Sequence, residues 1–154
     1  MKRISTLAGA GLFLALGFSA QAQELLTGSN VDAILDAAEV LGTATLTEQP
    51  NGDPLINGTT DGLAYQIYFR NCTANAACED LNFYTGFSAK PAPEVINAWN
   101  RDKRFSRAYL DNVQDAAIEM DIDLVKGVTP DYLASQFSLW SQVVAQFSSH
   151  ISYR

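Results

Sequence analysis

Histidine and cysteine are scarce in this chain of 154 residues, which contains one histidine and two cysteines. Serine or cysteine catalysis needs a base that orients and deprotonates the nucleophile. The single histidine, His150, lies near the end of a predicted helix, where we expect it to face solvent. Two thiols and one imidazole also fall short of the four ligands of a structural zinc site. The sequence therefore favours a protein that is not an enzyme and has no metal or other cofactor.

Long apolar runs are also missing beyond residue 22. Residues 1–22 have the three regions of a cleavable secretory signal peptide. Lys2-Arg3 is the positive region, an apolar run from Ile4 to Phe18 follows, and Ala20-Gln21-Ala22 has the small-x-small pattern that signal peptidase recognises. An uncleaved anchor is the alternative, but the run of about 15 residues is shorter than the roughly 20 of a spanning helix. We expect cleavage after Ala22, export to the periplasm or the exterior, and no stable membrane insertion afterwards.

Basic residues are few in the mature chain. Cleavage would leave eight Lys and Arg against seventeen Asp and Glu, hence a net charge of −9. Such an acidic surface argues against binding nucleic acid or anionic membranes. The remaining 132 residues suit a single domain, which we place at 30–152 after a polar lead-in at 23–29.

The two cysteines, Cys72 and Cys78, are six positions apart. In an oxidising compartment a nearby pair of this kind forms a disulfide. The bond would close a seven-residue loop and add about 2 kcal/mol by the chain-entropy estimate. A metal pair is the competing interpretation, although the chain has too few further ligands.

Hydrophobic periodicity and turn residues predict an α+β domain with an antiparallel sheet flanked by helices, in the order α-β-β-β-α-β-β-α. Ser29 or Asn30 can cap the first helix, and Thr129 and Pro130 begin the last. A further short strand at 55–56 is open, because turn formers surround it. The expected elements are helices at 30–41, 93–101 and 129–151, a strand at 43–47, and hairpins at 63–70 with 80–85 and 105–110 with 116–125.

A disulfide at Cys72 and Cys78 would also fix the register of the first hairpin. That register sorts apolar residues onto one face and pairs opposite charges on the other. The expected core-face pairs are Phe69–Leu81, Ile67–Phe83 and Tyr65–Thr85, and the expected outer-face pairs are Arg70–Asp80 and Tyr68–Asn82.

The second hairpin has two faces of different character. The apolar face would pair Ser106, Ala108 and Leu110 with Met120, Ile118 and Ala116, and the other face would pair Phe105, Arg107 and Tyr109 with Asp121, Glu119 and Ala117. Phe105, Arg107 and Tyr109 form a candidate partner-binding patch, since aromatic residues and arginine are favoured anchors of interfaces. The alternative is that a helix of the same chain covers them. The turn at 112–114 has no glycine, which leaves its type open.

Glu119, Asp121 and Asp123 recur at every second position, so all three carboxylates fall on one strand face. Such a row could bind calcium or supply an acid and a base. The stretch from Asp111 to Asp123 lacks the glycine and the ligand spacing of a calcium loop. A solvated strand face that discourages aggregation is the simpler interpretation.

Several motifs resemble the YbjN-domain family. Asn97-Ala98-Trp99-Asn100 precedes the segment from Arg104 to Asp111, and Asp121-Ile122-Asp123-Leu124 and Gly127-Val128-Thr129 follow, so that the resemblance covers roughly residues 28–151. It implies a fold like that of class I type III secretion chaperones, which is often dimeric and binds extended polypeptide. The family is labelled a sensory transduction regulator and brings no catalytic residues to carry over.

We therefore expect an exported binding or regulatory protein of the bacterial envelope with a protein or peptide partner, bound at Phe105, Arg107 and Tyr109. A metal-dependent enzyme that uses Glu119, Asp121 or Asp123 is one alternative. The other is a structural or stress-related envelope protein that works as a homodimer, with Tyr68 and Tyr84 as its contacts.

Overall fold

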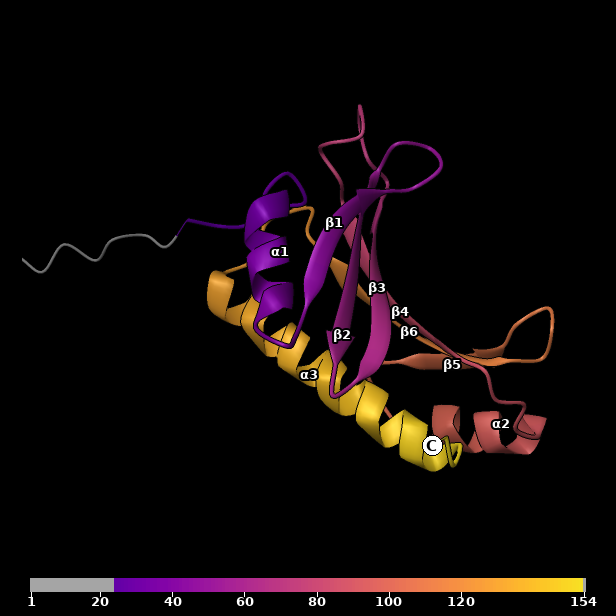
Figure 1. The fold of residues 1–154 in the computed structure, drawn as a ribbon. Helices are drawn as coiled ribbons and strands as arrows, with labels where there is room; N and C mark the ends of the chain where they lie inside the picture. Colours follow the sequence, from indigo (N-terminus) through magenta and orange to yellow (C-terminus); the bar gives the residue numbers. More distant parts are fainter. Residues whose placement is uncertain (1–23, 154) are drawn as a thin grey trace, which may run out of the picture.

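The computed structural model describes residues 24–153, so the predicted signal peptide lies outside the described residues. This part of the chain forms three helices and six strands, and Figure 1 shows how they are arranged. The elements are α1 (Val31–Glu39), β1 (Ala44–Glu48), β2 (Pro54–Thr60), β3 (Leu63–Arg70), β4 (Asp80–Phe87), α2 (Pro93–Asp102), β5 (Arg107–Leu110), β6 (Ala116–Asp123) and α3 (Pro130–His150). None of these helices has the length and apolar character needed to span a membrane.

The six strands form one antiparallel sheet with the order β1-β2-β3-β4-β6-β5. The first four strands follow one another as a meander. The long pairing of β4 with β6, which spans eight residue pairs, then joins the meander to the C-terminal hairpin. This order leaves β1 and β5 as the two edges of the sheet. The predicted α+β class is therefore confirmed.

The register predicted for the first hairpin is confirmed in four of its five pairs. Ile67 lies opposite Phe83 and Phe69 opposite Leu81, while Tyr68–Asn82 and Arg70–Asp80 pair on the other face. The ladder begins one residue later than expected, with Gln66 opposite Tyr84, so the expected pair of Tyr65 and Thr85 does not form. The opposite charges at Arg70 and Asp80 form no ion pair, because the Arg70 guanidinium lies over the Tyr68 ring at 4.6 Å from its centre.

Strand β2 runs over seven residues, although its sequence is rich in turn formers and only 55–56 was expected to be extended. Pro54 stands at the first position, where a strand tolerates proline. Asn57 hydrogen-bonds along the sheet to Thr47 and accepts from Gln66. A Cβ on Gly58 would lie 2.4 Å from the Tyr65 ring, so glycine makes room for that ring. Cross-strand packing thus overrides the local turn preference.

Strand β5 starts at Arg107, so the expected pairs Phe105–Asp121 and Ser106–Met120 do not form. The four pairs from Arg107–Glu119 to Leu110–Ala116 are as predicted. Phe105 has a φ of +67°, a left-handed conformation that an extended strand does not have. Strand β6 ends at Asp123, two residues before the expected end.

The turn between β5 and β6 is built without glycine. The Asp111 carboxylate accepts the amides of Val113 (2.9 Å) and Asp115 (2.8 Å), and Gln114 has a φ of +67°. This combination is typical of a three-residue hairpin loop that ends in a left-handed residue. The turn type, which the sequence leaves open, is thus a loop whose amides are satisfied by the Asp111 carboxylate.

The N-terminal cap predicted for α3 forms, whereas Asn30 makes no side-chain cap of α1. Thr129 caps α3 as predicted, because its hydroxyl accepts the Tyr132 amide at 3.1 Å. Asn30 is the N-cap residue of α1, but its side chain accepts from Thr27 and caps no helix amide. Pro93 begins α2, with Ile96 and Trp99 buried as expected.

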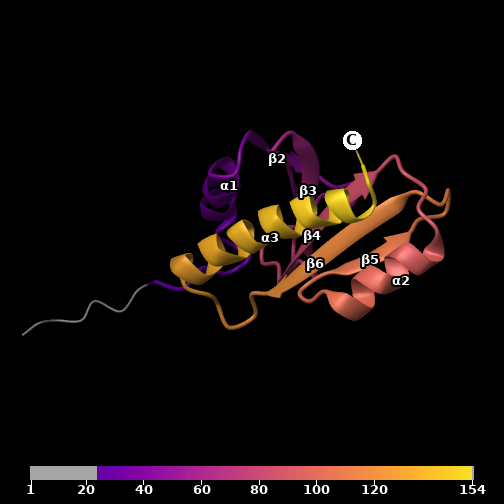
Figure 2. The ribbon, with the colours of Figure 1, turned by 90° about the horizontal axis from the view of Figure 1, so that it is seen from below.

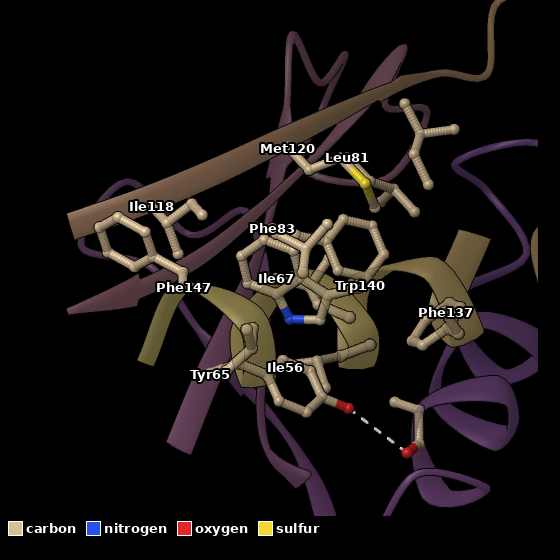
Figure 3. Close-up of a cluster of buried hydrophobic side chains, with 14 of the residues drawn as sticks. Ile56, Tyr65, Ile67, Leu81, Phe83, Ile118, Met120, Phe137, Trp140 and Phe147 are labelled. Carbon is tan, nitrogen blue, oxygen red and sulfur yellow. Dashed lines mark hydrogen bonds between the residues drawn. The ribbon is translucent and has the colours of Figure 1, made fainter. Parts of the chain in front are cut away.

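One hydrophobic cluster joins all three helices to one face of the sheet, which we call the inner face. Figure 2 shows α3 running across the front of the sheet in that view, with α2 beside β5. Figure 3 shows the centre of the cluster, where Phe83 packs against Phe137 at 5.1 Å and Trp140 at 5.6 Å between ring centres. The Tyr65 hydroxyl donates to the Ala38 carbonyl of α1 (3.3 Å), and burial raises the pKa of Tyr65 to about 12.

Helix α2 closes the β5 edge of the sheet by a side-chain clamp. The Asn100 amide nitrogen donates to the Ala108 carbonyl and its oxygen accepts the Ala108 amide, both at 2.9 Å. The Trp99 indole donates to the Ser106 hydroxyl at 3.1 Å. One asparagine thus supplies the two hydrogen bonds that a neighbouring strand would have made.

We expect Asn100→Ala to lower the free energy of unfolding by about 1–2 kcal/mol, because it removes the hydrogen-bond partners of both Ala108 backbone groups. Urea denaturation measures the change. Asn97→Ala is the matched control, since Asn97 is exposed on the same helix and the substitution has the same effect on helix propensity. Equal stabilities of the two variants would show that the clamp contributes nothing.

Candidate functional site

The face of the sheet opposite the helices, which we call the outer face, carries the candidate residues. No helix among the described residues packs on it, because the buried side chains of all three helices belong to the single inner cluster. On β3 to β6 it carries a set of polar, charged and tyrosine side chains, most of which are half-buried or exposed. They are Gln66, Tyr68 and Arg70 of β3, Asp80, Asn82 and Tyr84 of β4, Glu119, Asp121 and Asp123 of β6, and Arg107 and Tyr109 of β5.

Glu119 contacts two side chains of β5 at the β5 end of the outer face. Its carboxylate forms an ion pair with Arg107 and accepts a hydrogen bond from the Tyr109 hydroxyl at 2.8 Å. The Arg107 guanidinium lies 5.7 Å from the centre of the Tyr109 ring. The Arg107 side chain is 72% exposed, whereas that of Glu119 is only 14% exposed. The carboxylate therefore holds a cation and an aromatic ring in place at a surface that faces solvent.

This arrangement raises the pKa of both partners of Glu119. Partial burial, followed by the hydrogen bond to Glu119 and the charge of that carboxylate, raises the pKa of Tyr109 well above its ordinary value. The hydrogen bond and ion pair with Glu119 raise the pKa of Arg107. Both groups stay protonated at neutral pH, so they offer hydrogen-bond donors and a positive charge, with no base for proton abstraction.

Phe105 lies outside the strand but is strongly exposed, at 65%. The Arg104 guanidinium lies 5.5 Å from the centre of the Phe105 ring. No helix of the described chain covers Phe105 or Arg107, so the alternative that α2 or another helix hides them is wrong. Arg107 and Tyr109 share the outer face, while Phe105 lies in the connection from α2, two residues before Arg107.

Arg104 is not one of the predicted site residues, although the sequence carries a signal for it. Arg101, Lys103, Arg104 and Arg107 place four cations within seven residues around the exposed Phe105. Lys103 lies 5.6 Å from the centre of the Trp99 ring, and Arg101 pairs with Asp102. Half of the eight basic residues beyond residue 22 thus gather at the α2–β5 connection.

The two tyrosines considered as dimer contacts lie near the middle of the outer face. Tyr68 and Tyr84 meet edge to face, with 6.2 Å between ring centres. The Tyr68 hydroxyl donates to Gln66 at 2.7 Å. Desolvation, with neighbouring Tyr68, Asp111 and Glu119, raises the pKa of Tyr84. Both rings are half-buried within their own sheet, and a role in a dimer stays a prediction.

The three carboxylates of β6 share a face as predicted but have separate partners. Glu119 pairs with Arg107 and accepts a hydrogen bond from Tyr109. Asp121 accepts a hydrogen bond from Asn82, and Asp123 accepts one from the Val125 amide, both at 2.8 Å. Within residues 24–153, no three His, Cys, Asp or Glu side chains are placed to hold one metal ion. The geometry assigns these carboxylates to cross-strand and turn contacts.

His150 is exposed, as expected, and also packs between two helices. A ring nitrogen lies 2.8 Å from the Val95 carbonyl, and the ring contacts Trp99 at 5.4 Å between centres. No nucleophile adjoins it among these contacts. The sulfur atoms of Cys72 and Cys78 lie 2.08 Å apart, which is compatible with the expected disulfide.

Comparison with known proteins gives one family and a related structure. Residues 28–152 match the YbjN family, described as "Putative bacterial sensory transduction regulator". The fold is similar to that of the type III secretion chaperone SycH of Yersinia pestis, solved in complex with a stable fragment of YscM2. The TM-score is 0.47 at 16% sequence identity, over 74% of this chain and 96% of that chain. No curated protein matches the sequence.

Glu119→Gln should lower the pKa of Tyr109 towards its ordinary value while leaving it raised, because burial remains but the carboxylate is gone. Tyrosinate absorbance or NMR of the tyrosine rings during an alkaline titration measures the shift. Asp121→Asn is the control, since Asp121 has its own partner in Asn82. If the Tyr109 hydroxyl titrates at the same pH in both variants, Glu119 does not raise the pKa of Tyr109.

Proposed function

The chain belongs to the YbjN family, and on that premise we propose that it is an exported, non-enzymatic binding or regulatory protein of the bacterial envelope with a polypeptide partner. The proposed binding surface is the β5 patch, which comprises Phe105, Arg107 and Tyr109. One observation carries the proposal: the Glu119 carboxylate, only 14% exposed, holds an exposed arginine and a tyrosine on a face that no described helix covers, two residues after an exposed phenylalanine.

The chemistry of the β5 patch favours a peptide over a small molecule. Arginine and aromatic side chains are the residues that most often carry binding energy at protein interfaces. Arg107 is already fixed by Glu119, so a partner that contacts it loses less side-chain entropy on binding. No helix among the described residues covers the surface, which leaves room for an extended chain.

A non-enzymatic role agrees with the state of the ionisable groups. Tyr109 and Arg107 both keep their protons, and the single histidine contacts a backbone carbonyl and two aromatic rings. A general base needs to reach the proton that it abstracts with a pKa near the working pH. The β5 patch contains no such group.

Affinity capture from an envelope extract tests the proposal. The mature, oxidised protein as bait should enrich a polypeptide that the triple variant Phe105→Ala, Arg107→Ala, Tyr109→Ala does not retain, because the variant lacks both aromatic rings and the cation. Mass spectrometry identifies what is retained.

The matched control is the double variant Lys126→Ala, Tyr132→Ala, which removes an exposed cation and an exposed ring from the β6–α3 connection and α3. Capture that is lost equally in both variants, or retained in the triple variant, would reject the β5 patch. Circular dichroism of each bait verifies its fold.

Export has a separate test in the protein isolated from cells. The intact mass should be that of a chain that begins at Gln23. Reduction should increase this mass by two hydrogens if Cys72 and Cys78 are bonded. Cys72→Ser should then lower the free energy of unfolding by about 2 kcal/mol under oxidising conditions. A mass that retains residues 1–22 would contradict cleavage, and an unchanged mass on reduction would contradict the disulfide.

A further inference from the structure

The two edges of the sheet are treated differently. An edge strand presents unpaired amides and carbonyls to which another strand can add. At the β5 edge, Asn100 occupies both backbone groups of Ala108, and α2 lies alongside the strand (Figure 2). Addition of a strand at this position would have to displace the clamp.

The β1 edge has no such clamp among the described residues. The Thr59 amide donates to the Thr43 carbonyl at 2.9 Å, so the alternation of an antiparallel ladder turns the amides and carbonyls of Ala44, Leu46 and Glu48 away from β2. No backbone or side-chain group of residues 24–153 bonds to these outward groups. Leu46 is 43% exposed beside them. We call the outward backbone groups of Ala44, Leu46 and Glu48 the β1 edge.

The β1 edge is held in a fixed position at its C-terminal end. The buried Gln49 side chain donates to the Pro54 carbonyl at 2.8 Å and, across β2, to the Phe69 carbonyl at 2.7 Å. Asn75, in the loop between Cys72 and Cys78, donates to Asp53 at 2.9 Å. These contacts fix the β1–β2 turn against β3, so little ordering is needed when a new strand pairs with β1.

Acidic residues predominate around the β1 edge, and the cation beside its C-terminal end is Arg70, whose guanidinium lies 3.5 Å from the Gln49 side-chain oxygen. Residues 24–69 contain seven acidic residues and no lysine, arginine or histidine, whereas residues 70–154 contain ten acidic residues, eight lysine and arginine residues and one histidine. Six of the seven acids are exposed, and none of the seven takes part in an ion pair among the described residues. Glu48 lies on β1 itself, and Asp32, Asp36 and Glu39 lie on α1, which packs against β1 and β2.

We propose that the β1 edge binds an extended polypeptide segment that carries lysine or arginine, by adding it as a seventh strand. Backbone hydrogen bonds to Ala44, Leu46 and Glu48 would supply the pairing, and the surrounding carboxylates would select the cationic side chains. The inference rests on the proposed function in that the ligand is a polypeptide, but it places that ligand at the edge opposite the β5 patch.

A second copy of this chain fits the β1 edge poorly. Pairing β1 with β1 would bring two acidic surfaces together, and like charges across an interface oppose association. The alternative strand, β5 of another copy, is already clamped by Asn100. Charge and edge protection therefore favour a separate, cationic chain.

The test uses a fluorescein-labelled ten-residue peptide of alternating valine and lysine and its matched valine–glutamate counterpart. Fluorescence anisotropy should show binding of the lysine peptide alone, with an affinity that falls as salt rises. Leu46→Pro removes an outward amide without touching the ladder to β2 and should weaken binding about tenfold or more. Leu46→Val keeps the amide and is the matched control.

Two further variants separate this inference from the β5 patch. Glu48→Lys should weaken binding of the lysine peptide, and the triple alanine variant of Phe105, Arg107 and Tyr109 should bind it as wild type does. Loss of binding in the triple variant with retention in Leu46→Pro would overturn the β1 site and leave the proposed function standing. Failure of the β5 patch in affinity capture would leave the β1 site unaffected.

Amide hydrogen exchange of the wild-type protein keeps the test valid if Leu46→Pro fails to fold. Added lysine peptide should slow exchange at Ala44, Leu46 and Glu48, whereas Thr45 and Thr47 already bond to β2 and should change little. Unchanged exchange at the three outward amides, or equal binding of the glutamate peptide, would refute the proposal.

Discussion

The pairing of β4 with β6 is the contact on which the rest of the sheet depends. All other strand pairs join neighbours in the sequence, whereas this one spans α2 and β5 and matches eight residues of each strand. Closing such a loop costs chain entropy, which buried side chains repay. Phe83 and Leu81 of β4 and Ile118 and Met120 of β6 supply that burial on the inner face, under Phe137 and Trp140 of α3.

The same pairing assembles the outer face from distant parts of the chain. Asn82 of β4 donates to Asp121 of β6, and Tyr84 lies opposite Glu119, which in turn holds Arg107 and Tyr109 of β5. Each of these polar side chains has a partner on a neighbouring strand. A polar sheet face can stay exposed because its groups satisfy one another and water.

The strand order also decides which strands become edges. Because β6 inserts between β4 and β5, the four-residue β5 is left at one side and β1 at the other. The chain clamps β5 with Asn100 and surrounds it with four of its cations, whereas β1 is unclamped in a region where acidic residues predominate. The two sides of one sheet thus differ in charge and in the availability of backbone groups, which gives the molecule two chemically distinct surfaces for a polypeptide.

The sequence by itself determined the α+β class, the helices near their observed bounds and four pairs of the first hairpin, because these follow from periodicity, caps and the spacing of the two cysteines. It also indicated Arg107 and Tyr109 on one strand face. Local pattern could not reveal that Asn57 and Gly58 belong to a full strand, since neighbouring Gln66 and Tyr65 stabilise them there. Nor could it place Phe105 off the strand or show Asn100 as the clamp of β5. Those features depend on contacts between residues of different elements, and only the tertiary structure brings such residues together.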